Sequence, residues 1–212
     1  MSTNSTILDA ARLIVRNEGA AVLAVADQID DTFIEVVDLL QDCSGKVFVT
    51  GSGTSGAIAR RMAHLLAVCG TPSVFINPMD ALHGTMGALA PGDVLISISR
   101  GGESSEINDF STRAQRRSVK VVAITAAPSS SLGRLADLTV TLTTEGDGDP
   151  GGVIAMGSTL VTAAWGDALA NILMRRRGYG WDQVLETHPA GAVGLITDLP
   201  DPLDRIDAPT SA

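Results

Sequence analysis

The spacing of apolar residues divides the chain into helical and extended segments. Residues 5–18 and 20–42 carry apolar side chains three or four positions apart, which predicts two amphipathic helices in an N-terminal helical hairpin. Further along, short runs rich in β-branched residues alternate with helical segments. Strands are predicted at residues 46–50, 73–76, 93–97, 119–125 and 138–142. The helices that follow them are predicted at about residues 58–69, 105–117, 130–136, 158–177 and 181–187.

The alternation of strands with helices indicates an α/β fold. We expect a three-layer sandwich in which helices cover both faces of a five-stranded, mainly parallel sheet. Residues 1–197 are expected to form this one domain, and residues 198–212, rich in Asp and Pro, a polar and flexible tail. Residues 144–157 are rich in Gly and Asp and predict a loop. Ligands of such sheets bind beyond the carboxyl ends of the strands, so the loops at that edge are the candidate site.

Composition and charge narrow the classes of partner. Only 3% of the residues are aromatic and the formal net charge is −9, so neither base stacking nor a positive surface favours nucleic acid or anionic lipid. No apolar run approaches the ~20 residues that span a bilayer, and the N-terminus lacks a signal-peptide pattern. Cys43 and Cys69 have no metal-ligand spacing, and no histidine pair has it either. We therefore expect a cytoplasmic protein that uses no metal and binds no membrane or nucleic acid.

The first strand leads into a glycine- and hydroxyl-rich loop, Gly51-Ser-Gly-Thr-Ser-Gly56. Glycines let the backbone approach a ligand, and the N-terminus of the following helix offers free N–H groups to an anion. The spacing of Gly51, Gly53 and Gly56 also fits the dinucleotide pattern G-x-G-x-x-G. That pattern expects an acidic residue near the end of the second strand, and none comes before Asp80, so phosphate binding is favoured over NAD binding.

The third strand leads into a second loop of the same kind, Ser99-Arg-Gly-Gly-Glu-Ser104. Ordinary strand-to-helix turns would explain the glycines of both loops. They explain less well why Ser52, Thr54 and Ser55 in the first loop are matched by Ser99 and Ser104 in the second. Two helix N-termini with hydroxyl donors at one sheet edge indicate a site for an anion such as phosphate.

These loops, with His83-Gly84 and Thr187-His-Pro-Ala-Gly-Ala-Val-Gly194, resemble the sugar isomerase (SIS) domain. Their order and spacing are most similar to the arabinose-5-phosphate isomerase branch, over roughly residues 5–195. In that branch the elements read GxGKSG, His-Gly, SxSGET and SHPGGALG. The resemblance implies a five-stranded parallel sheet flanked by helices, a homodimer or homotetramer, and a sugar phosphate as ligand.

The resemblance also implies which residues do the work. Phosphate and substrate would be bound by the two loops, through residues Gly51, Ser52, Gly53, Thr54, Ser55, Ser99, Gly101 and Ser104. His188 matches a histidine that the family borrows across a subunit interface, and Glu103 and His83 match a glutamate and a histidine of its motifs. A further family glutamate aligns best with Asp147, with Glu145 and Asp149 nearby.

Besides Asp147 in place of the family glutamate, the sequence departs from the family pattern in further ways. Thr54 stands where the branch has lysine, and Gly101 where the second loop has its middle serine. The paired regulatory (CBS) repeats that often follow the domain are expected to be absent. The missing lysine bears directly on which substrate the site accepts.

Aldose–ketose isomerisation moves a proton between neighbouring carbons through an enediol, which needs a base, an acid and a phosphate clamp, but no cofactor. Glu103 is the predicted base, with partial burial raising its pKa; alternatively it is a helix-end charge. His188 is predicted to serve acid–base chemistry or ring opening, or else is a solvated loop residue.

We expect an isomerase of a pentose or tetrose phosphate. A 6-phospho-3-hexuloisomerase is the alternative within the family. The alternative of another class is a non-catalytic phosphosugar sensor, as in SIS domains of transcription regulators.

Overall fold

A computed structural model describes residues 3–206. A five-stranded sheet lies at its centre, in the order β2-β1-β3-β4-β5, and every neighbouring pair is parallel. The strands are β1 (Val47–Gly51), β2 (Ser73–Phe75), β3 (Val94–Ile98), β4 (Lys120–Thr125) and β5 (Leu138–Thr141). The predicted strands are all present, each within about a residue of its expected bounds, and the predicted fold class is confirmed.

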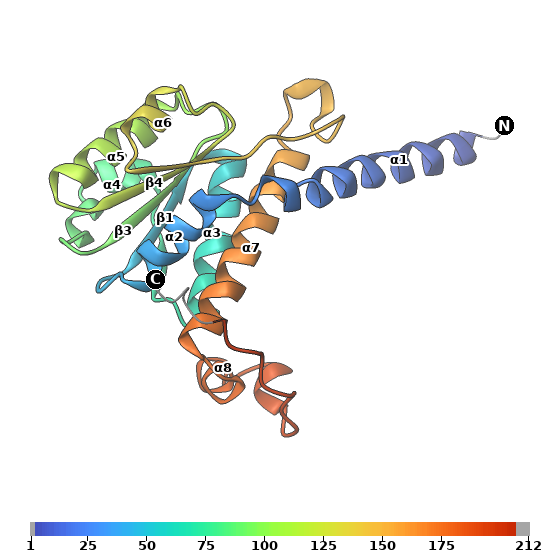
Figure 1. The fold of residues 1–212 in the computed structure, drawn as a ribbon. Helices are drawn as coiled ribbons and strands as arrows, with labels where there is room; N and C mark the ends of the chain where they lie inside the picture. The colour runs from blue at the N-terminus through green and yellow to red at the C-terminus, as the bar shows by residue number, and fades with distance from the viewer. Residues whose placement is uncertain (1–2, 207–212) are drawn as a thin grey trace.

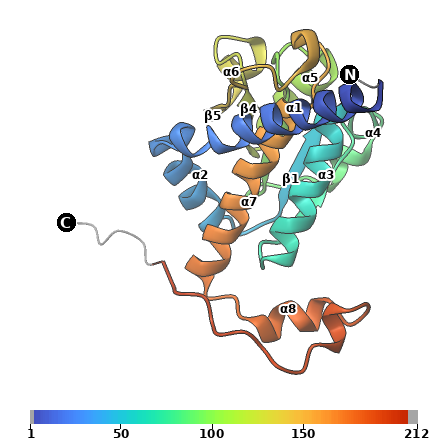
Figure 2. The ribbon, with the colours of Figure 1, turned by 90° about the vertical axis from the view of Figure 1, so that its right-hand side faces the viewer.

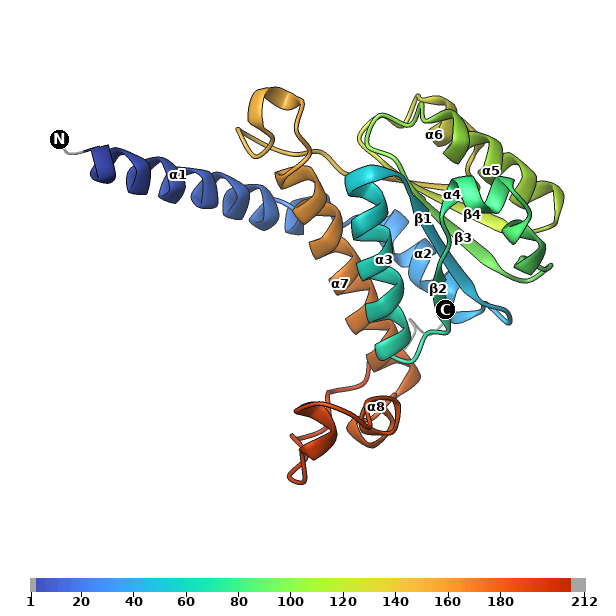
Figure 3. The same ribbon diagram turned by 180° about the vertical axis from the view of Figure 1, so that it is seen from behind.

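Helices cover both faces of this sheet, as Figures 1 and 3 show. The first layer holds α2 (Asp31–Gln41), α3 (Gly53–Val68) and α7 (Gly157–Arg177). The second layer holds α4 (Pro78–Leu82), α5 (Ser105–Arg116) and α6 (Ser131–Leu135). Alternation along the strands builds the two cores: Val47 and Val49 pack in the first, whereas Phe48 between them packs in the second. Trp165 of α7 meets Phe33 of α2 edge-to-face, with ring centroids 5.3 Å apart.

The two predicted N-terminal helices are present but divided differently. Helix α1 (Thr3–Leu23) runs through Gly19, where a break was expected, and a short 3-10 turn (Ala26–Gln28) joins it to α2. The N-terminal part of helix α1 projects away from the body of the molecule, and the helix packs against α7 where it reaches the body (Figures 1 and 3). The pair is therefore more open than a hairpin.

The chain after α7 forms an arm at the far end of that helix (Figure 2). It contains α8 (Trp181–Thr187) and a 3-10 turn (Val193–Leu195), followed by residues without regular structure. The predicted tail lies partly in this arm: Trp181 Nε1 donates to the Asp201 carbonyl and Arg175 Nε to the Asp204 carbonyl. Residues 207–212 of that prediction lie outside the described residues. Among residues 3–206, no helix combines the length and the apolar character that crossing a membrane requires.

Candidate functional site

The two predicted loops leave the same edge of the sheet from neighbouring strands. Strands β1 and β3 pair so that Gly51 lies opposite Ile98, and the two loops begin where these strands end. The first loop turns tightly into α3, since a Cβ on Gly56 would lie 2.6 Å from the Gly51 carbonyl oxygen. Gly53, with φ +57°, adopts the left-handed conformation that glycine tolerates. The sequence therefore correctly predicted both the place and the glycine requirement of this loop.

Hydroxyl groups of the loops form a small network where α3 and α5 begin. Ser52 Oγ donates to Glu106 Oε1 at 2.6 Å, and this hydrogen bond is the main reason that the pKa of Glu106 is lowered. In the second loop, the Ser99 and Ser104 hydroxyl oxygens lie 3.4 Å apart, and the Gly102 N–H donates to Ser99 Oγ. Glu106 thus joins the two loops, a role that the sequence analysis missed.

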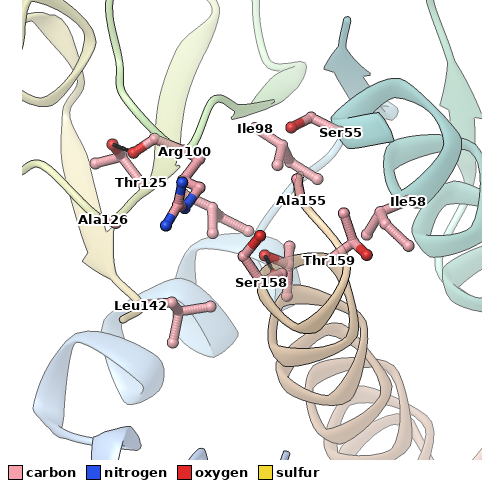
Figure 4. A pocket seen from close by; sticks show the side chains of 12 residues that line it. Ser55, Ile58, Ile98, Arg100, Thr125, Ala126, Leu142, Ala155, Ser158 and Thr159 are labelled. Atoms are coloured by element: carbon pink, nitrogen blue, oxygen red, sulfur yellow. Dashed lines mark hydrogen bonds between the residues drawn. The ribbon is translucent and has the colours of Figure 1, made fainter. Parts of the chain in front are cut away.

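A cavity of about 20 Å³ lies between the two loops and the first turns of α7 (Figure 4). Its polar lining comes from several elements: Ser55, Arg100, Thr125, Ser158, Thr159 and Thr162. Apolar side chains of the sheet and α3, among them Ile58, Ile98 and Ile124, close its base. Of the loop residues predicted to bind phosphate, Ser55 faces this cavity, while Thr54 and Gly101 are exposed.

An ion pair joins the second loop to residues 144–157. Arg100 Nη2 lies 3.2 Å from Asp149 Oδ2, and Arg100 Nη1 donates to the Gly152 carbonyl at 3.0 Å. Asp149 Oδ1 accepts hydrogen bonds from the N–H groups of Met156 and Ser158, both at 2.9 Å. Burial raises the pKa of Asp149, but hydrogen bonds from the backbone and side chain of Ser158 and from the Met156 N–H, together with the charge of Arg100, outweigh it, so the pKa is lowered. Asp149 is therefore an ionised, buried carboxylate at the start of α7.

Glu103 differs from its expected environment. Its carboxylate is exposed and accepts a hydrogen bond from the Ser131 N–H, at the start of α6, at 2.9 Å. Hydrogen bonds from Ser131, and to a smaller extent the charge of Arg134, lower the pKa of Glu103. The expectation that partial burial raises this pKa is therefore wrong. Glu103 thus lies at the end of a helix, as its alternative interpretation as a helix-end charge expected. The helix is α6, with which Glu103 makes a tertiary contact.

The remaining predicted catalytic residues lie apart from one another. His83 is exposed at the C-terminal end of α4, and Asp147 is exposed within the loop 144–157. His188 ends α8, at the far end of α7 from the cavity (Figure 1), with Nδ1 3.0 Å from the Val184 carbonyl oxygen. At 1.5 Å per residue α7 is about 30 Å long, so one chain does not bring His188 to its own cavity.

Sequence reasoning overlooked the pairing of Arg100 with Asp149 and the role of Glu106. The signal for Glu106 was a second glutamate one helical turn after Glu103. Asp149 offered a weaker signal as one of several acids in a loop before a long helix. Within residues 3–206 no group of three or more His, Cys, Asp or Glu side chains is placed to hold a metal ion.

Comparison with known proteins points to one family. The family described as "SIS domain" matches residues 39–172. The arabinose 5-phosphate isomerase KdsD of Shigella flexneri is 40% identical over 173 residues, which are 81% of this chain and 53% of that protein. The arabinose 5-phosphate isomerase GutQ of Salmonella typhi is 34% identical over 191 residues, 90% of this chain and 60% of that protein. The chain thus spans little more than half the length of these relatives.

Solved structures of SIS-like proteins share this fold. A protein of Escherichia coli CFT073, solved in complex with a sugar phosphate, superposes with a TM-score of 0.85 at 32% identity, covering 89% of this chain and all of that one. The sugar isomerase domain of an RpiR transcription factor from Sphaerobacter thermophilus shares the fold at a TM-score of 0.70 and 20% identity, covering 84% of this chain and 95% of that one.

Proposed function

Because the chain belongs to the SIS-domain family, we propose that it is an aldose–ketose isomerase acting on a small sugar phosphate, with a pentose or tetrose phosphate as substrate. The observation that carries the proposal is the pair of hydroxyl-rich loops at neighbouring strands, beside a cavity that contains Arg100. The names of the relatives, arabinose 5-phosphate isomerases, support the choice of substrate class.

In this proposal the loops clamp the phosphate and leave the sugar carbons near the carboxylates. Hydroxyls and N–H groups of residues 51–56 and 99–104 bind the phosphate oxygens, as helix N-termini favour anions. Glu103, whose carboxylate is ionised at neutral pH, takes the proton from the carbon beside the carbonyl and returns it to the neighbouring carbon of the enediol. The reaction as proposed needs no metal and no redox cofactor.

His188 is proposed to act in the site of a neighbouring subunit, in a homodimer or homotetramer. If Nδ1 carries the proton, it donates to the Val184 carbonyl and leaves Nε2 free for acid–base chemistry or ring opening. Asp147 and His83 stay predictions, Asp147 because it belongs to the loop that Arg100 contacts, and His83 through the family resemblance.

The test is proton NMR of the purified protein with arabinose 5-phosphate and other sugar phosphates in D₂O. Interconversion of one aldose–ketose pair, with deuterium entering beside the carbonyl, is the expected result. Turnover of a hexulose phosphate alone would select the 6-phospho-3-hexuloisomerase alternative. Binding without turnover of pentose, tetrose, hexulose or heptose phosphates would overturn the enzyme proposal in favour of a sensor.

The role of Glu103 is tested by Glu103→Gln. Glutamine keeps an oxygen that accepts from the Ser131 N–H but cannot accept the substrate proton. We expect kcat to fall at least about 100-fold while phosphosugar binding persists. Glu35→Gln, an exposed carboxylate on α2, is the matched control and should retain full activity. A Glu103→Gln protein as active as this control would remove Glu103 from the mechanism.

A further inference from the structure

Arg100 is the one charged side chain among the described residues that line the cavity. Figure 4 shows its guanidinium pointing into the space between Thr125 and the first turn of α7. The first loop contains no cation, and the chain as a whole carries a net charge of −9. An anion entering this cavity would therefore meet its positive charge at Arg100.

The carboxylate of Asp149 is bound by groups that also bind other anions. One oxygen accepts from two N–H groups where α7 begins, and the other faces the Arg100 guanidinium at 3.2 Å. A phosphate oxygen would be bound by the same donors, since guanidinium and helix N–H groups are general phosphate ligands. The Ser158 side chain lies beside the same carboxylate and helps to lower its pKa, so it is a further donor at this position.

The cavity in this arrangement is too small for a sugar phosphate. It holds about 20 Å³, whereas ligand pockets usually measure some 300–1,000 Å³. Arg100, which lines this cavity, is held by its contacts to Asp149 and to the Gly152 carbonyl. Gly151 and Gly152 follow Asp149 with positive φ, a conformation that glycine adopts more readily than other residues.

We propose that Arg100 binds the phosphate group of the substrate, and that Asp149 occupies its place until phosphate displaces it. The inference rests on the proposed function, of which it names the phosphate-binding cation. The Arg100 side chain is 44% exposed whereas that of Asp149 is 4% exposed, so an anion from solvent reaches the guanidinium and competes for it there. A carboxylate and a phosphate dianion repel each other, so phosphate binds less tightly to a guanidinium that is already paired with Asp149.

The test compares Arg100→Gln, Asp149→Asn and the control Arg113→Gln, binding inorganic phosphate and arabinose 5-phosphate in calorimetric titrations. Arg113 forms an exposed ion pair with Asp109 on α5, and its loss changes net charge as Arg100→Gln does. The asparagine introduced by Asp149→Asn keeps an oxygen for the N–H groups of Met156 and Ser158 but lacks the charge that holds Arg100.

We expect Arg100→Gln to weaken both ligands about 10- to 100-fold, mainly as a raised KM where turnover is measured. Asp149→Asn should bind both about threefold tighter or more, because the competing charge is gone. The double variant should resemble Arg100→Gln, and Arg113→Gln should resemble the wild type.

Three results would overturn the inference. They are no binding of either ligand by the wild type, unchanged binding by Arg100→Gln, or weaker binding by a folded Asp149→Asn protein. The last would mean that Asp149 positions Arg100 instead of competing for it. The expected binding pattern without any isomerisation would instead remove the proposed function and leave Arg100 as the phosphate ligand of a sensor.

Discussion

Single carboxylates in this chain serve different purposes according to the donors around them. Asp149 faces a guanidinium and two N–H groups, whereas Glu103 accepts from the start of α6 and Glu106 from a serine of the other loop. In each case the pKa is lowered, so all three are ionised at neutral pH. Each of the three therefore presents a negative charge at this edge of the sheet.

Asp137 gives a pH-dependent stability that can be measured at the residue scale. Partial burial raises its pKa, but hydrogen bonds from Lys120, Val121 and Gln115 outweigh it and lower the pKa. A lowered pKa means that the folded state binds fewer protons than the unfolded state. The stabilisation is therefore complete above the ordinary pKa of about 4 and is lost as the pH falls through the folded value.

We expect Asp137→Asn to lower the free energy of unfolding by about 1–2 kcal/mol at pH 7. The difference from wild type should shrink towards zero in acid. Urea denaturation at a series of pH values measures it, with the exposed Asp109→Asn as control. A deficit that stays constant down to about pH 2 would show that packing, not charge, explains the loss.

At the scale of elements, two glycines in different helices predict opposite effects of an added methyl group. Gly56→Ala would place a Cβ 2.6 Å from the Gly51 carbonyl oxygen, so the first loop must shift. Gly19 lies inside α1 with nothing within 4 Å of an added Cβ, and alanine favours a helix interior. We expect Gly56→Ala to cost about 1–3 kcal/mol and weaken phosphate binding, and Gly19→Ala to add up to about 1 kcal/mol.

Thermal unfolding and phosphate titration check both changes. Phosphate affinity should be normal in Gly19→Ala, which makes it the reference for an added methyl group away from the loop. Normal stability and affinity in Gly56→Ala would show that the tight turn between β1 and α3 is not needed.

Elements with a repeating sequence pattern were predicted well from the sequence. Elements whose start or end depends on a single contact were predicted less well. The five strands were found because buried β-branched runs are distinctive, and the two loops because glycine and serine gather after them. Helix α4 was missed: five residues are too few for a period, and its start depends on Asn77 capping the N–H groups of Met79 and Asp80. Helix α1 continues through Gly19 because a single glycine weakens a helix without ending it.

Within the site, the sequence predicted where the loops lie, but not which partners their charged side chains contact. Arg100 and Asp149 meet only because the loop 144–157 folds back over the second loop, a tertiary contact with no local pattern. The same holds for Glu103, whose partner Ser131 is the first residue of α6, the helix after the next strand. The hydroxyl and glycine content of a loop is visible in its own sequence. The partner of a carboxylate depends on how several loops come together at the edge of the sheet.

The whole molecule carries apolar surface on two extensions. Apolar side chains are exposed along α1, which projects from the body, and along the C-terminal arm (Figures 1 and 2). They are Ile7, Leu8, Leu13, Ile14, Val15 and Leu23 on α1, and Val193, Leu195, Ile196, Leu199 and Leu203 on the arm. Extended apolar surfaces of this kind mark contacts between proteins, which supports the proposed homo-oligomer.

The distance between His188 and the cavity turns that proposal into a prediction about shared sites. If a site needs the loops of one chain and His188 of another, Glu103→Gln and His188→Gln subunits should complement each other. In hybrid dimers, one site would combine an intact Glu103 with an intact His188. Random mixing makes about half of the dimers hybrids, so about a quarter of wild-type activity should return when the two inactive variants are co-refolded.

A mixture of Glu103→Gln with the Glu103→Gln/His188→Gln double variant has no complete site and should stay inactive. If the two single variants form hybrids, detected by two affinity tags, yet regain nothing, then His188 does not serve a neighbouring subunit's site.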